Sequence, residues 1–230
     1  MGGLGRSFDG SYAEYALVPK SHTFKVNTSL LFEELAAIPE TYYTAWGSLF
    51  ESLDLKKTDT LLIRGATSAL GYAGIQIAKT IGAKVIATTH KENKLDLLYE
   101  ADDKLIDDGI LYDKVENVNK ILDLVGPKYL IDSLKTVTKK GIVCNTGILG
   151  GVYALNNFDP IKDIPNGVYL TGFYSNRPTQ KDILDIVEFI NSNKLKPKIG
   201  KVFEFENIKD ALICQDKKLI DGKIVVRMKG

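Results

Sequence analysis

Residues 60–89 decide the fold, and they read Thr60-Leu-Leu-Ile-Arg-Gly65-Ala-Thr-Ser68-Ala-Leu-Gly71-Tyr-Ala-Gly74-Ile-Gln-Ile-Ala-Lys-Thr-Ile-Gly82-Ala-Lys-Val-Ile-Ala-Thr-Thr89. An apolar, β-branched run leads into a turn of small residues. Apolar residues then recur at helical spacing up to a Gly-Ala turn, and a second apolar run follows. This order predicts a strand, a helix and a second parallel strand, which is the first βαβ unit of a dinucleotide-binding fold.

The turn itself has the spacing Gly65-x-x-Ser68-x-x-Gly71, with serine where the middle glycine of the usual dinucleotide pattern is expected. Small residues let the backbone N–H groups approach a pyrophosphate, and the helix N-terminus adds a partial positive charge. The strands on either side favour dinucleotide binding. The alternative is an unrelated α/β protein that places small residues at such a turn.

The end of the second predicted strand bears on the choice of cofactor. NAD-binding proteins usually end this strand with Asp or Glu, which holds the ribose hydroxyls. Here the strand ends at Thr89, followed by His90, Lys91 and Lys94, while Glu92 falls at the start of the next helix. A hydroxyl and nearby cations suit a 2′-phosphate, so NADP is favoured over NAD. The alternative is that the two lysines lie on an ordinary solvated helix face.

The rest of the chain alternates in the same way after an N-terminal stretch that looks all-β. Strands are expected at 11–18, 60–63, 84–88, 104–107, 120–124, 141–146, 168–173, 198–205 and 223–227. Helices are expected at 30–38, 42–53, 70–81, 91–99, 180–193 and 207–217. Strands separated by helices indicate an α/β protein with a parallel, doubly wound sheet.

Composition excludes several classes of protein. The chain has 230 residues, a net charge of +1 and 44% hydrophobic residues, which argues against wholesale disorder and against a general nucleic-acid binder. No apolar run approaches the roughly 18 residues of a membrane span, and the start lacks the apolar region of a signal peptide. We therefore expect a soluble, cytoplasmic protein that binds neither nucleic acid nor membrane.

Metal and nucleophile motifs are missing from the sequence. The two cysteines, Cys144 and Cys214, and the two histidines, His22 and His90, have no metal-ligand spacing, and no G-x-S-x-G motif occurs. Cys144 lies in a predicted core strand, where a buried thiol is expected. No catalytic or metal-binding side chain is therefore predicted.

With these stretches taken together, the chain from Gly2 to Gly230 resembles the medium-chain dehydrogenase/reductase superfamily, in its zinc-independent quinone oxidoreductase branch. Such proteins are often labelled zinc-containing alcohol dehydrogenases. The matching stretches are Phe8–Pro19, Ala36–Gly47, Gly65–Thr89, Asp123–Gly126, Gly141–Gly151 and Gly222–Val226. The resemblance implies a Rossmann doubly wound parallel sheet with a remnant of a GroES-like β domain. It also implies hydride transfer between NADPH and a quinone or another conjugated or simple carbonyl.

The resemblance also assigns cofactor contacts by position. It places Thr44 near the nicotinamide, and it places Ser68, Ala69, Leu70 and Gly71 at the pyrophosphate. The 2′-phosphate region falls to Thr89, His90 and Lys94, and the loop against the nicotinamide is Gly147, Ile148 and Leu149. A tyrosine often found after the third strand is replaced by Asp107-Asp108.

The family's chain begins well before Met1, which sets the expected domain boundaries. Residues 1–29 are expected to be the GroES-like remnant, 30–217 the Rossmann domain and 218–230 a strand returning to the GroES-like part. Strands without their partners expose a sheet edge, so self-association as a homodimer is expected, through that surface or through the edge at 168–174.

Two functions remain open from the sequence. One is an NADPH-dependent oxidoreductase, and the other is a nucleotide-binding fragment without turnover, because much of the substrate-domain wall is missing. A methyltransferase-like protein is disfavoured, since that class usually ends its second strand with an acidic residue.

Overall fold

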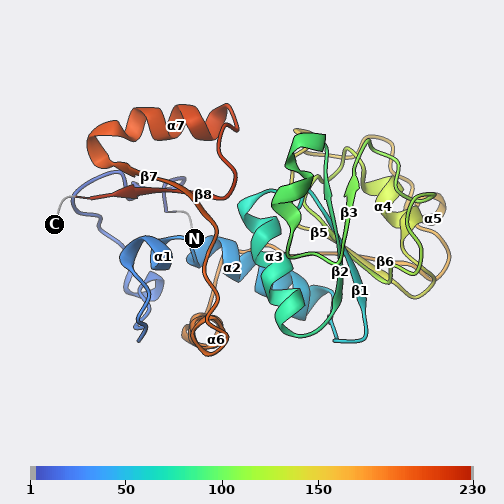
Figure 1. The fold of residues 1–230 in the computed structure, drawn as a ribbon, viewed down its shortest axis with the longest axis horizontal. Coiled ribbons are helices and arrows are strands. Elements are labelled where there is room, and N and C mark those ends of the chain that lie inside the picture. Colours follow the sequence, from blue (N-terminus) through green and yellow to red (C-terminus); the bar gives the residue numbers. More distant parts are fainter. Residues whose placement is uncertain (1–3, 229–230) are drawn as a thin grey trace. The chain divides into compact units, whose positions relative to one another are not determined.

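A six-stranded parallel sheet forms the centre of the segment Thr44–Tyr174 (Figure 1). Its strands are β1 (Thr60–Arg64), β2 (Lys84–Thr89), β3 (Asp103–Ile106), β4 (Lys120–Asp123), β5 (Ile142–Asn145) and β6 (Tyr169–Gly172). They lie in the order β3-β2-β1-β4-β5-β6, and every pairing is parallel. The order reverses between β1 and β4, which is the doubly wound arrangement. The predicted α/β class and parallel sheet are confirmed.

Helices cover both faces of this sheet. They are η2, a π-helix (Gly47–Ser52), α3 (Ala69–Thr80), η3, a 3-10 helix (Glu92–Leu98), α4 (Leu130–Thr136) and α5 (Pro160–Asp163). A Cβ atom added at Gly74 of α3 would lie 3.1 Å from a methyl group of Leu122. Leu134 of α4 instead packs in a buried cluster with Ile121. Because neighbouring strand residues point to opposite faces, α3 and α4 lie on opposite sides of the sheet, and the strands are apolar on both faces.

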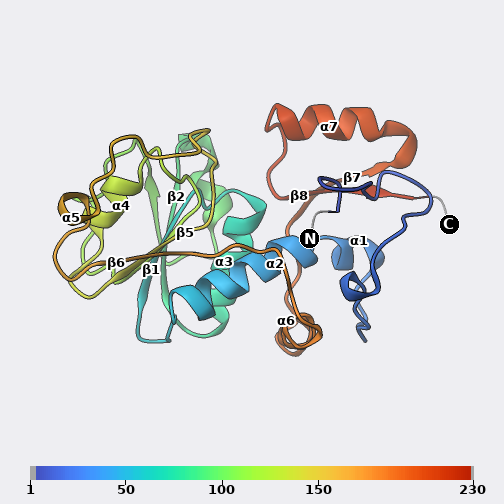
Figure 2. The same cartoon turned by 180° about the vertical axis from the view of Figure 1, so that it is seen from behind.

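The computed structural model describes residues 4–228, and the chain forms a second compact unit besides Thr44–Tyr174. This unit joins the N-terminal segment up to Tyr43 with the residues from Ser175 onward. Its elements are η1 (Lys20–His22), α1 (Phe32–Ala36), the start of α2 (Pro39–Trp46), α6 (Gln180–Ser192), β7 (Ile199–Glu204), η4 (Phe205–Asn207), α7 (Ile208–Asp216) and β8 (Lys223–Arg227). β7 and β8 pair in parallel, and α7 packs against both strands (Figure 2).

The N-terminal segment differs from the prediction. A strand was expected at Ser11–Val18, but within the described residues this stretch forms bends and no ladder. Tyr15 and Leu17 are 91% and 94% exposed. Alternating β-type residues form a strand only when a neighbouring strand supplies hydrogen-bond partners, and no part of the chain between residues 4 and 228 supplies them here. The predicted strand is therefore wrong.

The boundaries of the two compact units lie at 43/44 and 174/175, whereas the domain boundaries expected from the sequence lie at 29/30 and 217/218. The C-terminal elements bond to the N-terminal segment: the Gln180 side chain accepts a hydrogen bond from Lys25 N at 3.2 Å, and Lys196 pairs with Glu34 at 2.7 Å. α6, β7 and α7 therefore belong to this unit rather than to the one containing the six-stranded sheet. The assignment of domains by ancestry stays a prediction.

Candidate dinucleotide-binding site

The turn between β1 and α3 is held against the neighbouring strand. Gly65 has φ +78°, a left-handed conformation that favours glycine. Ala66 N donates to the carbonyl of Thr88 in β2 at 2.9 Å, and Ser68 N donates to the carbonyl of Gly65 at 3.2 Å. The chain therefore leaves β1, reverses tightly and enters α3 at the carboxyl edge of the sheet.

Ser68 is the N-cap of α3. Its backbone is extended, with φ −78° and ψ 162°, and its Oγ accepts a hydrogen bond from Gly71 N at 3.0 Å. The N–H groups of Ala69 and Leu70 lie in the first turn of α3, where the helix supplies no carbonyl four residues earlier to accept from them, and they point out of the helix end. Together with the positive end of the helix dipole, they suit an anionic group at this turn.

Gly71 allows the helix to approach the turn closely. A Cβ atom at this position would lie 2.4 Å from the carbonyl oxygen of Ala66 and 2.5 Å from its Cα. Backbone atoms cannot move aside as a flexible side chain does, so a side chain here would push α3 away from the turn. The four predicted pyrophosphate residues are thus consecutive at one small-residue turn, and this cradle fits the pyrophosphate of a dinucleotide.

The three residues predicted to contact the 2′-phosphate, at and after the end of β2, differ in their exposure to solvent. Thr89 is only 1% exposed, and its Oγ1 accepts a hydrogen bond from Lys91 N at 3.3 Å. His90 is exposed, and Lys94, in η3, is partly buried. The two basic side chains are therefore accessible near the carboxyl end of β2, whereas the hydroxyl of Thr89 is engaged inside the fold.

The loop after β5 reaches the turn after β1. Leu149 extends its side chain over Gly65, since a Cβ atom at Gly65 would lie 2.9 Å from Leu149 Cδ1. Ile148 and Leu149 are 46% and 44% exposed, so two apolar side chains are partly open to solvent here. Residues predicted at the pyrophosphate and at the nicotinamide are thereby brought to the same edge of the sheet.

Thr44 lies in α2 and is only 6% exposed. The helical segment that follows contacts the end of β5, because Ser48 Oγ lies 3.0 Å from Thr146 Oγ1. Cys144 Sγ lies 3.0 Å from the same hydroxyl, and burial raises the pKa of this thiol. Cys144 is 0% exposed, so its predicted burial is confirmed.

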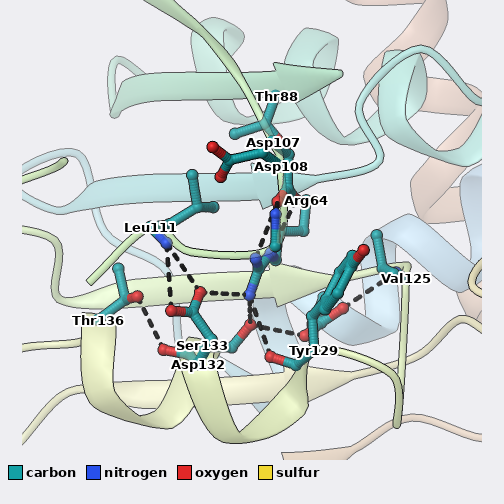
Figure 3. Close-up of polar contacts among 12 residues, drawn as sticks. Arg64, Thr88, Asp107, Asp108, Leu111, Val125, Tyr129, Asp132, Ser133 and Thr136 are labelled. Carbon is teal, nitrogen blue, oxygen red and sulfur yellow. Dashed lines mark hydrogen bonds and ion pairs between the residues drawn. The ribbon is translucent and has the colours of Figure 1, made fainter. Parts of the chain in front are cut away.

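A buried ionic cluster near this edge was not predicted from the sequence (Figure 3). Arg64 ends β1 and is 0% exposed. Its guanidinium donates to both carboxylate oxygens of Asp107 at 2.8 and 2.9 Å, and it pairs with Asp132 at 2.8 Å. It also donates to Ser133 Oγ at 2.9 Å, and Ser133 in turn donates to Asp123 at 2.7 Å.

The cluster holds one cation and three carboxylates. Burial lowers the pKa of Arg64, but the hydrogen bond and charge of Asp107, with the charges of Asp123 and Asp132, outweigh it and raise that pKa overall. Burial raises the pKa of Asp123 despite its hydrogen bonds.

The sequence does contain a signal that could have predicted this buried cluster. Charged residues end β1 and β4, and Asp107 follows β3, which are places where an apolar strand core gives way to charge.

The fold and the glycine turn define a Rossmann-type α/β protein. The family model for zinc-binding dehydrogenases matches residues 100–226, more than half of the 230 residues. The chain belongs to this family, within the medium-chain dehydrogenase/reductase superfamily.

Curated relatives are similar over nearly the whole chain. Quinone oxidoreductase-like protein 2 of Bos taurus is 25% identical over 94% of this chain and 66% of its own length. Acryloyl-coenzyme A reductase of Sulfurisphaera tokodaii is 26% identical over 98% of this chain and 67% of its own length. The chain thus spans about two thirds of the length of these relatives.

Solved structures agree on the fold. An NAD-dependent alcohol dehydrogenase superimposes with a TM-score of 0.85 at 27% identity, covering 98% of this chain and 67% of that one. The quinone oxidoreductase of Thermus thermophilus, solved also with NADPH, has a TM-score of 0.77 at 22% identity, covering 95% and 74%. The second likeness shows the fold alone.

The family's description contains zinc, and the described residues do not fit that ion. Within 4–228, no group of three or more His, Cys, Asp or Glu side chains is arranged to hold a metal.

Among residues 4–228, no helix combines the length and the apolarity that crossing a membrane requires.

Proposed function

We propose that this chain binds NADPH and belongs to an oxidoreductase that transfers hydride to a quinone or another conjugated carbonyl. The observation that carries the proposal is the turn from β1 into α3. Ser68 caps the helix, Gly71 lets it approach the turn, and the outward N–H groups suit a pyrophosphate. The named activities of the relatives, which include quinone oxidoreductase and acryloyl-coenzyme A reductase, support the reaction class.

When bound, NADPH supplies the hydride, and the residues of this chain bind and orient it. The turn at 65–71 holds the pyrophosphate, while Ile148 and Leu149 offer a partly exposed apolar surface to the nicotinamide. Hydride transfer needs donor and acceptor at near-attack distance with water excluded. A quinone accepts hydride readily and solvent can deliver the proton, so no acid–base side chain is required in this scheme.

The preference for NADPH over NADH rests on the residues after β2. β2 ends with Thr88 and Thr89 and has no carboxylate at its end, and Glu92 follows only in η3. His90 is exposed, and Lys94 is partly buried in η3. We propose that these two side chains contact the 2′-phosphate, because charge-assisted hydrogen bonds to phosphate are strong. The buried hydroxyl of Thr89 supports the end of β2 through its bond to Lys91 N.

The test is a fluorescence titration of the purified chain with NADPH and with NADH, in parent and Lys94→Gln forms. Lys94→Gln should weaken NADPH binding by about tenfold and leave NADH binding unchanged, since one charge-assisted bond to phosphate is lost. Lys57→Gln removes the same charge from the turn before β1, at the opposite edge of the sheet, and serves as the control. Equal binding of NADPH and NADH by the parent would overturn the cofactor assignment.

Turnover assays with a quinone and an enone then separate the two functions left open by the sequence. Oxidation of NADPH that depends on substrate supports the oxidoreductase. NADPH binding without turnover by this chain supports the alternative, a nucleotide-binding module without turnover. We further propose a homodimer located in the cytoplasm, with a small-molecule carbonyl or quinone as its substrate.

A further inference from the structure

The Arg64 guanidinium joins the ends of three strands to one helix. Arg64 is the last residue of β1, and its guanidinium donates to Asp107 just after β3. It also donates to Ser133 of α4 and, at 3.0 Å, to the carbonyl of Tyr129 at the start of that helix. Ser133 in turn donates to Asp123 at the end of β4. The bonds that join Arg64 to Asp107 and to Ser133, and Ser133 to Asp123, are buried, so solvent does not compete for them.

Asp123 in turn fixes the backbone that follows β4. Its Oδ1 accepts hydrogen bonds from Val125 N at 2.9 Å and from Gly126 N at 2.8 Å. Gly126 adopts φ +85°, and a Cβ atom there would lie 2.2 Å from the carbonyl oxygen of Gly147. The turn after β4 is therefore held in one conformation and packed directly on the loop after β5.

The loop after β5 depends on that turn for its own hydrogen bonds. Leu149 N donates to the carbonyl of Leu124 at 3.0 Å, and Gly150 N donates to the carbonyl of Val125 at 2.9 Å. Leu149 then extends over Gly65. A continuous set of contacts thus runs from Arg64 to the apolar side chains at the predicted nicotinamide end.

We propose that Arg64, Ser133 and Asp123 are positioning residues that set the conformation of the loop at 146–150, and with it the nicotinamide half of the cofactor site. The inference rests on the proposed NADPH binding and names the residues that shape one half of that site. None of the three needs to touch the cofactor, because they act through the turn at 125–126 and the loop packed on it.

A purely stabilising role is the competing explanation. Buried ion pairs often contribute little net stability, because desolvation offsets the attraction, and their better attested role is to specify one conformation. The two explanations differ in what they predict for the two halves of the cofactor. Loss of stability alone acts on both halves alike, whereas loss of positioning acts on the nicotinamide half.

The experiment compares two ligands on the full chain. NADPH occupies both halves of the site, whereas adenosine 2′,5′-bisphosphate occupies the half at the end of β2. Ser133→Ala removes the hydroxyl between Arg64 and Asp123 and should weaken NADPH binding by about tenfold, while adenosine 2′,5′-bisphosphate binding changes less than about twofold. Thr136→Val, one turn along α4, removes a hydroxyl that bonds only the carbonyl of Asp132 among the described contacts and should change neither affinity.

Asp123→Asn gives a second measurement if Ser133→Ala folds poorly. The amide oxygen still accepts from Val125 and Gly126, but the amide nitrogen cannot accept from Ser133. Asp123→Asn should weaken NADPH alone, and the double variant should be no weaker than Ser133→Ala, because both changes break one connection. Equal loss of both ligands, or no loss of either, would overturn the positioning role while leaving the proposed function intact. If the parent bound neither ligand, the proposed function and this inference would fail together.

Discussion

Ser68 has one observed role and one proposed role. Its hydroxyl caps α3 by accepting from Gly71 N. The proposed pyrophosphate site lies at the same turn. A serine at this place holds the helix end in shape and adds no negative charge. A helix N-cap and the proposed anion site are therefore compatible at this residue, because the capping group is neutral.

Substitutions at Ser68 should separate these roles. Ser68→Ala should lower the free energy of unfolding by about 1 kcal/mol, since the cap is lost. Ser68→Asp keeps a good cap and should hold stability to within about 0.5 kcal/mol, but its carboxylate should weaken NADPH binding more than tenfold through repulsion of the phosphates. Urea unfolding and fluorescence titration measure the two effects. An aspartate variant that binds NADPH as the parent does would place the pyrophosphate elsewhere.

At the scale of elements, α1 is tied by ion pairs to the C-terminal part of its unit. Arg227 of β8 pairs with Glu33 at 2.7 Å, and Lys196 pairs with Glu34 at 2.7 Å. The pKa of Glu33 is lowered by a backbone hydrogen bond and by Arg227. The pKa of Glu34 is lowered chiefly by Lys196, with help from Leu31 N. A five-residue helix is marginal alone, so these bonds contribute to its order.

These ion pairs predict that the unit containing α1 is less stable at acid pH than at neutral pH. Because both folded pKa values lie below the ordinary glutamate value of 4.5, the pairs stabilise the folded chain above that pH. That contribution is lost as the pH falls below 4.5 through the lowered values. Glu34→Gln should therefore reduce the change in the urea midpoint between neutral and acid conditions. Glu116→Gln, in an exposed loop, is the control, and an unchanged pH profile for Glu34→Gln would contradict the assignment.

At the scale of the whole molecule, β6 is the last strand in the order of the six-stranded sheet. Its Tyr169 is 58% exposed, and Tyr174 beyond it is 80% exposed. An edge strand presents backbone hydrogen-bonding groups that another strand can use, and exposed aromatic residues favour association. This edge supports the proposed homodimer.

Tyr169→Lys tests that proposal, because a lysine on an edge strand opposes strand addition. The parent should have the mass of a dimer by size-exclusion chromatography with light scattering, and Tyr169→Lys should shift it towards the monomer. Tyr153→Lys places the same charge on an exposed loop residue, 79% accessible, and should leave the mass unchanged. A monomeric parent would exclude the dimer, and a dimeric Tyr169→Lys would move the interface to another surface.

Local patterns explain where prediction succeeded. β1, β2 and α3 were predicted closely because apolar runs at 60–63 and 84–88 are bounded by small-residue turns, and each run is buried on both faces. The strand expected at Ser11–Val18 failed for the converse reason. A strand needs a neighbour, and alternation of residue types within one segment does not say whether that neighbour exists.

The parallel α/β fold, the turn at 65–71 and the class of cofactor that this turn suits could be predicted from the amino-acid sequence, because each depends on residues close together in the chain. The contacts of Arg64 with Asp107 and Ser133, which lie 43 and 69 residues away in the chain, could be found only in the folded protein. The same holds for the position of Leu149 over Gly65 and for the burial of Thr89. Periodicity within a segment indicates only how that segment folds on itself. Which buried charges become partners depends on strand order, and that order is set by the packing of the whole sheet.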